Sequence, residues 1–252
     1  MKRTILAVLL LLSLSGCATT NPNLPPEVPP RHTVNEFRDQ PVAYVSDPWE
    51  SFNRNMYRFN YYFDSYLFLP VVHGYEFITP VFVQDRVSHF FDNLSEIRNL
   101  TNSIFQLKGK EAGIALGRFL TNSTLGLGGL FDPATKWGLE KHPEDFGKTL
   151  GYWGVGSGPY LVLPVFGPSS ARDTGGLVAD GAIRYGIYNA TIPNSDDRFT
   201  ITTGVEVLEA IDTRHQQPFR YYDGGYPFEY ELVRFVYHEK RELESGKPAT
   251  EK

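Results

Sequence analysis

The sequence has very little cysteine: Cys17 is the only one among 252 residues. A single thiol forms no intrachain disulfide, and a cysteine-based metal site needs several thiolates, so both are excluded. The chain also lacks a basic tract, and its formal net charge is −5. We therefore expect no nucleic-acid partner, because proteins that bind nucleic acid present a basic patch or stripe.

Long apolar runs are missing as well. One run extends only from Ile5 to Leu12, well short of the roughly 20 apolar residues of a membrane-spanning helix. It follows the basic pair Lys2-Arg3 and ends at Leu14-Ser15-Gly16-Cys17, where small residues let a peptidase reach the backbone. This order predicts a lipoprotein signal peptide over residues 1–16, with Cys17 beginning the mature chain and carrying its lipid, including palmitate. A buried free thiol that happens to follow an apolar run is the alternative.

The residue after the cysteine is Ala18, not the aspartate that tends to retain Gram-negative lipoproteins in the inner membrane. We therefore predict a lipid-anchored protein of the outer membrane, on its periplasmic side. Residues 17–46 are proline-rich and polar, which predicts an extended tether. A single domain over 47–245 and a polar tail over 246–252 are expected to follow.

Aromatic residues, in contrast, are abundant, with 15 Tyr and 18 Phe. Asp47 before Pro48, with Glu50 completing a capping box, predicts a helix start, and Pro70 predicts the helix end. Aromatic and apolar residues recur along this helix at spacings of three and four, which places them on one face. That face is interpreted either as core or as the membrane-facing side of an amphipathic helix. The membrane-facing candidates are Trp49, Phe52, Met56, Phe59 and Phe63.

Further helices are expected along the rest of the chain, and no hairpin signal with period-two alternation stands out. The fold class is therefore predicted to be mostly α. The expected helices start at Thr79-Pro80 and cover about 95–107, 111–124, 168–185, 196–215 and 228–243.

Two segments combine glycine with apolar residues, which ordinary solvent loops do not. Residues 151–164 are one of them. Both this segment and a second one predict either a pair of tight turns in a helical core or an adaptable apolar hairpin that touches lipid or lines a passage, because glycine permits unusual dihedrals. This second segment is Leu125, Gly126, Leu127, Gly128, Gly129, Leu130 and Phe131.

Catalytic and cofactor patterns are absent. Gly147-Lys148-Thr149 ends like a phosphate-binding loop, but His142 stands where the first glycine is required. The G-x-S-x-G elbow is missing, and the six histidines show no metal-ligand spacing. We predict no catalytic residue, no metal and no cofactor, and hence no enzyme; a phospholipase built from distant residues is the enzymatic alternative.

Several blocks of the chain resemble one family. Residues 47–54 resemble the DPxExFNR opening of the MlaA (VacJ) family of outer-membrane lipoproteins. Residues 117–132, 145–151 and 158–173 resemble later blocks of the same family, in the same order. The similarity covers most of residues 47–186, whereas the part after about residue 194 is only loosely similar.

The resemblance implies a single ring-like helical domain that lies in the inner leaflet of the outer membrane and has a central channel. It also implies association with trimeric porins, removal of misplaced phospholipids from the outer leaflet and transfer to a soluble periplasmic carrier of the MlaC type. The 125–131 segment would then be a lip or hinge of the channel. Lys136, Lys141 and Arg172 are candidates for lipid phosphates, although solvated surface is the favoured interpretation of each. A structural, porin-associated envelope lipoprotein without transport activity is the alternative function.

Overall fold

The computed structural model describes residues 45–191, 197–223, 225 and 227–245. The predicted signal peptide over 1–16, the predicted lipidation site Cys17, most of the tether and the predicted tail over 246–252 lie outside the described residues. All described residues belong to one compact unit, residues 33–252.

The first helical run is longer than predicted. It comprises α2 (Glu50–Phe63), a π-helical turn η2 (Asp64–Phe68) and α3 (Leu69–Ile78). The predicted end at Pro70 is wrong, because this proline lies in the first turn of α3, directly after the π turn. A π turn bonds five residues back, as Leu69 N does to Asp64 O. The wider backbone there relieves the clash between a proline ring and the preceding turn.

The predicted capping box at the start of this run is also wrong. Trp49 occupies the N-cap position and no side chain caps the helix. The Asp47 carboxylate instead accepts hydrogen bonds from Asn53 (2.7 Å) and Arg234 (3.1 Å), and also one from Tyr230. A tertiary partner from the far end of the chain has therefore replaced the local cap.

The next two helices pack against each other. They are α4 (Val81–Phe105) and α5 (Gly109–Thr124), followed by the short α6 (Pro133–Lys136) and α7 (Phe146–Tyr152). The two helices predicted over 79–94 and 95–107 are one continuous helix, since nothing between 81 and 105 interrupts the hydrogen-bonded ladder. The two short helices were not predicted.

A β-hairpin is present although no hairpin signal with period-two alternation stands out in the sequence. Its strands β1 (Tyr160–Leu163) and β2 (Gly167–Ser170) pair antiparallel, with Tyr160 opposite Ser170. Two asparagines of α2 complete it. Asn53 accepts from Val162 N (2.8 Å) and donates to Tyr160 O (3.0 Å), and Asn60 bonds to Leu163 O and Val165 N in the same way.

These side-chain amides pair with the outer edge of β1 as a third strand would, which explains why a two-stranded hairpin persists. The helix predicted from Pro168 accordingly begins later, as α8 (Ala171–Thr191), because residues 167–170 form β2.

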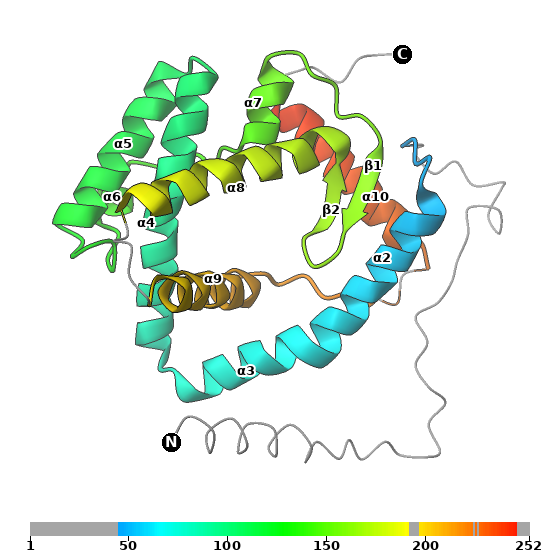
Figure 1. The fold of residues 1–252 in the computed structure, drawn as a ribbon, viewed down its shortest axis with the longest axis horizontal. Helices are drawn as coiled ribbons and strands as arrows, with labels where there is room; N and C mark the ends of the chain where they lie inside the picture. Colours follow the sequence, from blue (N-terminus) through cyan, green and yellow to red (C-terminus); the bar gives the residue numbers. More distant parts are fainter. Residues whose placement is uncertain (1–44, 192–196, 224, 226, 246–252) are drawn as a thin grey trace. The chain divides into compact units, whose positions relative to one another are not determined.

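The last helices are α9 (Arg198–His215) and α10 (Glu229–Glu244), close to the predicted ranges. Among the elements that Figure 1 shows, α4 contacts α7, α7 contacts α8 and α10, both of these contact β2, and β1 contacts α2. Together with the continuous run α2–η2–α3–α4, these contacts form a closed circuit, and α9 packs against α3 and α4. The mostly helical fold class is confirmed.

The buried interior of the described domain is unusually polar. The apolar core is small and centres on Tyr57, Tyr160, Val162 and Tyr230. Many other buried side chains carry amides or charges, and among them are Asn53, Asn60, Glu96, Asn99, Asn102, Arg118, Asn122, Arg172, Glu231 and Arg234. Polar groups inside a protein have to be hydrogen-bonded, so this interior is specified by its polar partners as much as by apolar contacts.

Candidate functional site

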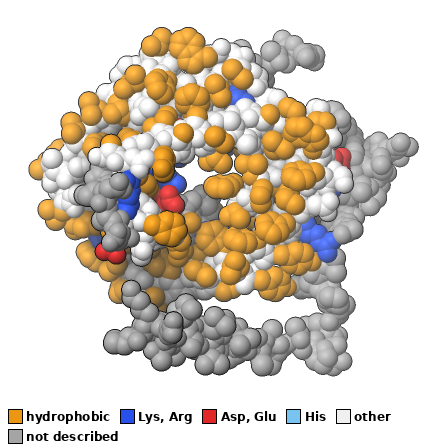
Figure 2. Space-filling model, in the orientation of Figure 1, with side chains coloured by type: hydrophobic (Ala, Val, Ile, Leu, Met, Phe, Trp, Pro, Cys, Tyr) orange, Lys and Arg blue, Asp and Glu red, His pale blue; other side chains and the backbone are white. Residues whose placement is uncertain are grey.

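Large hydrophobic side chains lie on the outside of the described domain. Phe77 is 90% exposed, Phe199 79% and Ile78 76%. Figure 2 shows such side chains gathered around a hollow near the middle of one face. Apolar surface on this scale marks contact with membrane or protein, because ordinary soluble surfaces rarely leave it uncovered. Within the described ranges, no helix is both long and apolar enough to cross a bilayer.

The predicted membrane-facing residues of α2 divide into two groups. Trp49, Phe52 and Phe59 are exposed. Met56 packs against the small aromatic core instead, and Phe63 is half-buried. One part of this face of α2 therefore contributes to the core, and the other part is exposed.

The 125–131 segment is a set of tight turns directly after α5. Its backbone is closed by hydrogen bonds from Gly129 N to Asn122 O and from Phe131 N to Gly126 O, both 2.9 Å. Leu125 and Leu127 are exposed, while Gly126 and Gly129 are buried. A Cβ at Gly129 would lie 2.7 Å from the Asn93 amide nitrogen, and the residue has φ +92°, so only glycine fits.

A buried arginine anchors the chain that follows this segment. The guanidinium of Arg118 donates to Glu96 (2.6 Å), to Asp132 (3.0 Å) and to the Thr135 hydroxyl (2.9 Å). Asn122 donates to the same Asp132 carboxylate. We call Glu96, Arg118, Asn122, Asp132 and Thr135 the Arg118 cluster; it ties α4, α5 and α6 together.

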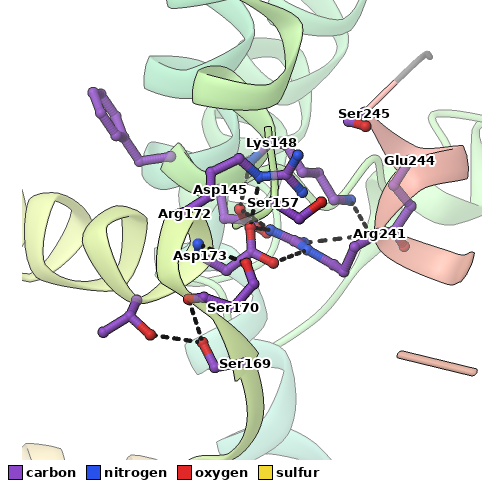
Figure 3. Close-up of polar contacts among 12 residues, drawn as sticks. Asp145, Lys148, Ser157, Ser169, Ser170, Arg172, Asp173, Arg241, Glu244 and Ser245 are labelled. Atoms are coloured by element: carbon purple, nitrogen blue, oxygen red, sulfur yellow. Dashed lines mark hydrogen bonds and ion pairs between the residues drawn. The ribbon is translucent and has the colours of Figure 1, made fainter. Parts of the chain in front are cut away.

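A second cluster joins elements that are far apart in the sequence. Figure 3 shows Arg241 reaching from α10 toward the carboxylates of Asp145 and Asp173. Its guanidinium nitrogens donate to Asp145 at 2.8 Å and to Asp173 at 2.8–2.9 Å, and Tyr237 donates to Asp173 at 2.6 Å. We call these four residues the Arg241 cluster. Asp145 also caps α7 by accepting from Lys148 N.

These contacts shift the acidities of the carboxyl groups. Burial by itself would raise the pKa of Asp173, but hydrogen bonds from Arg241 and Tyr237 outweigh it and lower the pKa to about 2. The pKa of Asp132 is likewise lowered to about 2, because hydrogen bonds from Thr135 and Arg118 outweigh its burial. Both carboxyl groups are therefore charged at neutral pH, and each has its countercharge inside the protein.

An amphipathic cavity of about 340 Å³ lies beside the Arg241 cluster. Its wall comes from α4, the N-cap of α7, the β1–β2 hairpin, α8 and α10, so residues from five separate parts of the chain meet there. Charged and apolar side chains share the lining. Those that matter below are Arg98, Leu163, Phe166, Leu177, Asp180, Lys240, Arg241 and Glu244.

The three cations that the sequence suggested for lipid phosphates lie in different surroundings. Arg172 is buried beside Asp173 (3.1 Å), Lys141 pairs with Asp92, and Lys136 is exposed at the end of α6. Sequence reasoning missed Arg98 and Lys240. A cation on a helix carries no sequence signal that tells whether the fold turns it toward a cavity. Within the described residues, no group of three or more His, Cys, Asp or Glu could hold a metal ion.

A helical domain with a polar, ion-paired interior and an apolar exterior defines a class of protein whose surface is suited to lipid or to apolar protein surfaces. The chain belongs to the MlaA lipoprotein family, whose model matches residues 45–244. The resemblance inferred from the sequence is thereby confirmed.

Relatives from several bacteria are similar to the chain. The intermembrane phospholipid transport system lipoprotein MlaA of Escherichia coli K12 is 38% identical over 176 residues, covering 68% of this chain and 66% of that protein. The MlaA lipoprotein of Haemophilus influenzae is 32% identical over 187 residues, covering 73% and 68%. An uncharacterized protein of Rickettsia prowazekii is 41% identical over 145 residues. The match spans 57% of this chain and only 58% of that relative's length.

A solved structure has a similar fold. It comes from work on the structural basis for maintenance of bacterial outer membrane lipid asymmetry. Its chain superimposes with a TM-score of 0.65 at 33% identity, covering 80% of this chain and all of that one. The helical architecture is therefore that of the family.

Proposed function

We propose that this protein removes mislocalised phospholipids from the outer leaflet of the outer membrane and passes them toward a periplasmic carrier. The observation that carries the proposal is the combination of an exposed apolar exterior with an amphipathic cavity that charged side chains line. In this proposal the exterior rests among the acyl chains of the inner leaflet, and Cys17 carries the lipid anchor at the periplasmic side. An anchor and an apolar surface are the two attachments that stable membrane binding requires.

The charged side chains that line the amphipathic cavity provide what a headgroup needs in order to cross. Moving a charged headgroup through hydrocarbon costs many kcal/mol, because the charges lose their hydration. In the proposal, a passage lined by charged side chains replaces that hydration, while the acyl chains stay in contact with apolar surface. The domain itself supplies a path and no energy, so the direction of transport has to come from the carrier downstream. No bond is made or broken in such a step, so the proposal assigns the protein no enzymatic activity.

The 125–131 segment is proposed to form the lip of this passage. Its exposed leucines stand beside glycines with left-handed φ, and Arg86 stacks on Phe131 with its guanidinium carbon 4.4 Å from the ring centroid. A porin trimer and a soluble carrier of the MlaC type are the proposed partners. They are the partners that family membership suggests, and the apolar exterior offers surface for a porin.

The proposal is tested by measuring phospholipid in the outer leaflet of a deletion strain with a membrane-impermeant amine probe. Wild-type chain should lower the surface phospholipid, whereas Cys17→Ser should not, because the anchor is lost. The same lipid extracts are examined for lysophospholipid, which a phospholipase would produce. Unchanged surface phospholipid in the deletion, together with a weakened permeability barrier, would favour the purely structural alternative.

The lip is tested by Gly128→Ala. The Gly128 position is open to solvent but has φ +73°, so alanine strains the backbone without meeting any neighbour. We expect slower lipid removal at unchanged protein level. Gly113→Ala on α5 is the matched control, because that site is also open but has ordinary helical φ. Equal lipid removal by Gly128→Ala and wild type would remove the lip from the proposal.

A further inference from the structure

The amphipathic cavity beside the Arg241 cluster contains charges of both signs, and most of them are already paired. Arg241 is saturated by Asp145 and Asp173. Glu244 is shared between Lys148 (3.3 Å) and Lys240 (3.8 Å). These groups neutralise one another, so they do not account for what the cavity would attract.

Two charged groups of the lining have no such counterpart. The exposed guanidinium of Arg98 makes no hydrogen bond or ion pair with any described residue. The carboxylate of Asp180 accepts from the Asn102 amide (3.0 Å) and from Phe146 N (2.9 Å), both neutral donors. Arg98 lies on α4 and Asp180 on α8, and both line the same cavity. The cavity therefore presents one uncommitted cation and one carboxylate without a cationic partner.

The rest of the wall is apolar and accessible. Phe166 of the hairpin turn is 71% exposed and Leu177 of α8 is 42% exposed. A volume of about 340 Å³ is at the lower end of ligand pockets, which suits a headgroup with the start of its chains rather than a whole lipid.

We propose that this cavity binds the zwitterionic headgroup of a phospholipid. Arg98 holds the phosphodiester, and Asp180 faces the ammonium group. Phe166 and Leu177 contact the glycerol and the first acyl carbons. Guanidinium is suited to phosphate because its planar donors match two phosphate oxygens. This inference rests on the proposed function, since it names the lipid class and the residues that meet it along the path.

The site is tested with the full mature lipoprotein in mild detergent, titrated with the water-soluble probe dihexanoyl phosphatidylethanolamine and followed by calorimetry. Arg98→Gln should raise the Kd about tenfold, the effect of losing one charge-assisted phosphate contact. Arg98→Lys should restore part of the affinity. Lys110→Gln is the matched control, because it removes the same charge from an exposed position outside the cavity. Thermal unfolding of Arg98→Gln should match that of wild type, because the side chain has no partner to lose.

Other probes identify the source of the binding. Dihexanoylglycerol, which lacks the phosphate, should not bind, and dihexanoyl phosphatidylglycerol, which lacks the ammonium, should bind more weakly. Excess inorganic phosphate should not displace the lipid; if it does, the cavity is a free-anion site and the proposal is overturned. Binding by Arg98→Gln equal to wild type overturns it as well.

Failure of this site is distinguishable from failure of the proposed function. If wild type clears surface phospholipid in cells while Arg98→Gln binds the probe normally, the cavity is wrong and the transport function stands. If wild type binds the probe through Arg98 but does not alter surface phospholipid, the headgroup site stands and the transport function fails.

Discussion

The Arg118 cluster and the Arg241 cluster both pair an inaccessible arginine with carboxylates, but they draw these carboxylates from different parts of the chain. Each surrounds one arginine with two carboxylates, and both guanidiniums are nearly inaccessible, with 3% and 12% of the side chain exposed. The first gathers its members from residues 96–135, so it closes a local stretch around the glycine-rich segment. The second connects Asp145 and Asp173 to Arg241 and fastens α10 to α7 and α8. The difference indicates that one cluster maintains a local fold, while the other closes the circuit of elements.

Removing the arginine of the Arg118 cluster should have the largest effect on the free energy of unfolding. Arg118→Leu leaves Glu96, whose side chain is 1% exposed, as an uncompensated buried charge. We expect a loss of about 3–5 kcal/mol in the free energy of unfolding, measured by thermal or denaturant unfolding in mild detergent. Lys110→Ala, an exposed cation near the start of α5, should change it very little. A loss below about 1 kcal/mol for Arg118→Leu would mean that this cluster is dispensable.

Disruption of the Arg241 cluster should destabilise the protein more locally. Arg241→Leu is expected to cost about 2–4 kcal/mol, because two partly buried carboxylates lose their main hydrogen-bond donor. Hydrogen exchange should then rise first in α10, while α4 and α5 keep their protection. A uniform rise in hydrogen exchange across all helices would show that α10 does not open separately. The two clusters would then not differ in how far their effect on stability extends.

Acid provides a smaller perturbation that affects both clusters. The folded pKa of Asp173 and of Asp132 is about 2, below the usual value of 3.8. The stabilisation is therefore complete above about pH 4 and is lost as the pH falls toward 2. For the buried Asp173 the difference corresponds to on the order of 2 kcal/mol. Unfolding midpoints measured across this window should fall for wild type, and the Asp173 contribution should vanish in Asp173→Asn.

The family motifs turn out to be largely structural. Asn53 completes the hairpin, Arg118 and Asn122 hold the chain after the glycine-rich segment, and Asp145 and Asp173 bind Arg241. Their presence made the family recognisable from the sequence. They gave no indication of which residues face a lipid, because residues that hold the helices and the hairpin together carry no information about the side chains on the surface.

Sequence periodicity located the long helices well and the boundaries less well. Ranges near 111–124, 196–215 and 228–243 agree with α5, α9 and α10. Two of the misses share one cause, because Asp47 and the residues of the hairpin depend on partners distant in the chain. The miss at Pro70 has a local cause, the π turn that precedes it. Asp47 left its predicted capping role because Arg234 and Tyr230 reach it, and β1 exists because α2 supplies two amides at its edge.

The sequence by itself determined the mostly helical class and the family, because periodicity, motifs and composition are properties of neighbouring residues. Only the tertiary structure decided which side chains meet. Arg98, Asp180 and Lys240 lie on three helices whose order along the chain does not reveal that they line one cavity. The physical reason is that charge pairing depends on distances between elements, and those distances are set by packing that involves the whole domain at once.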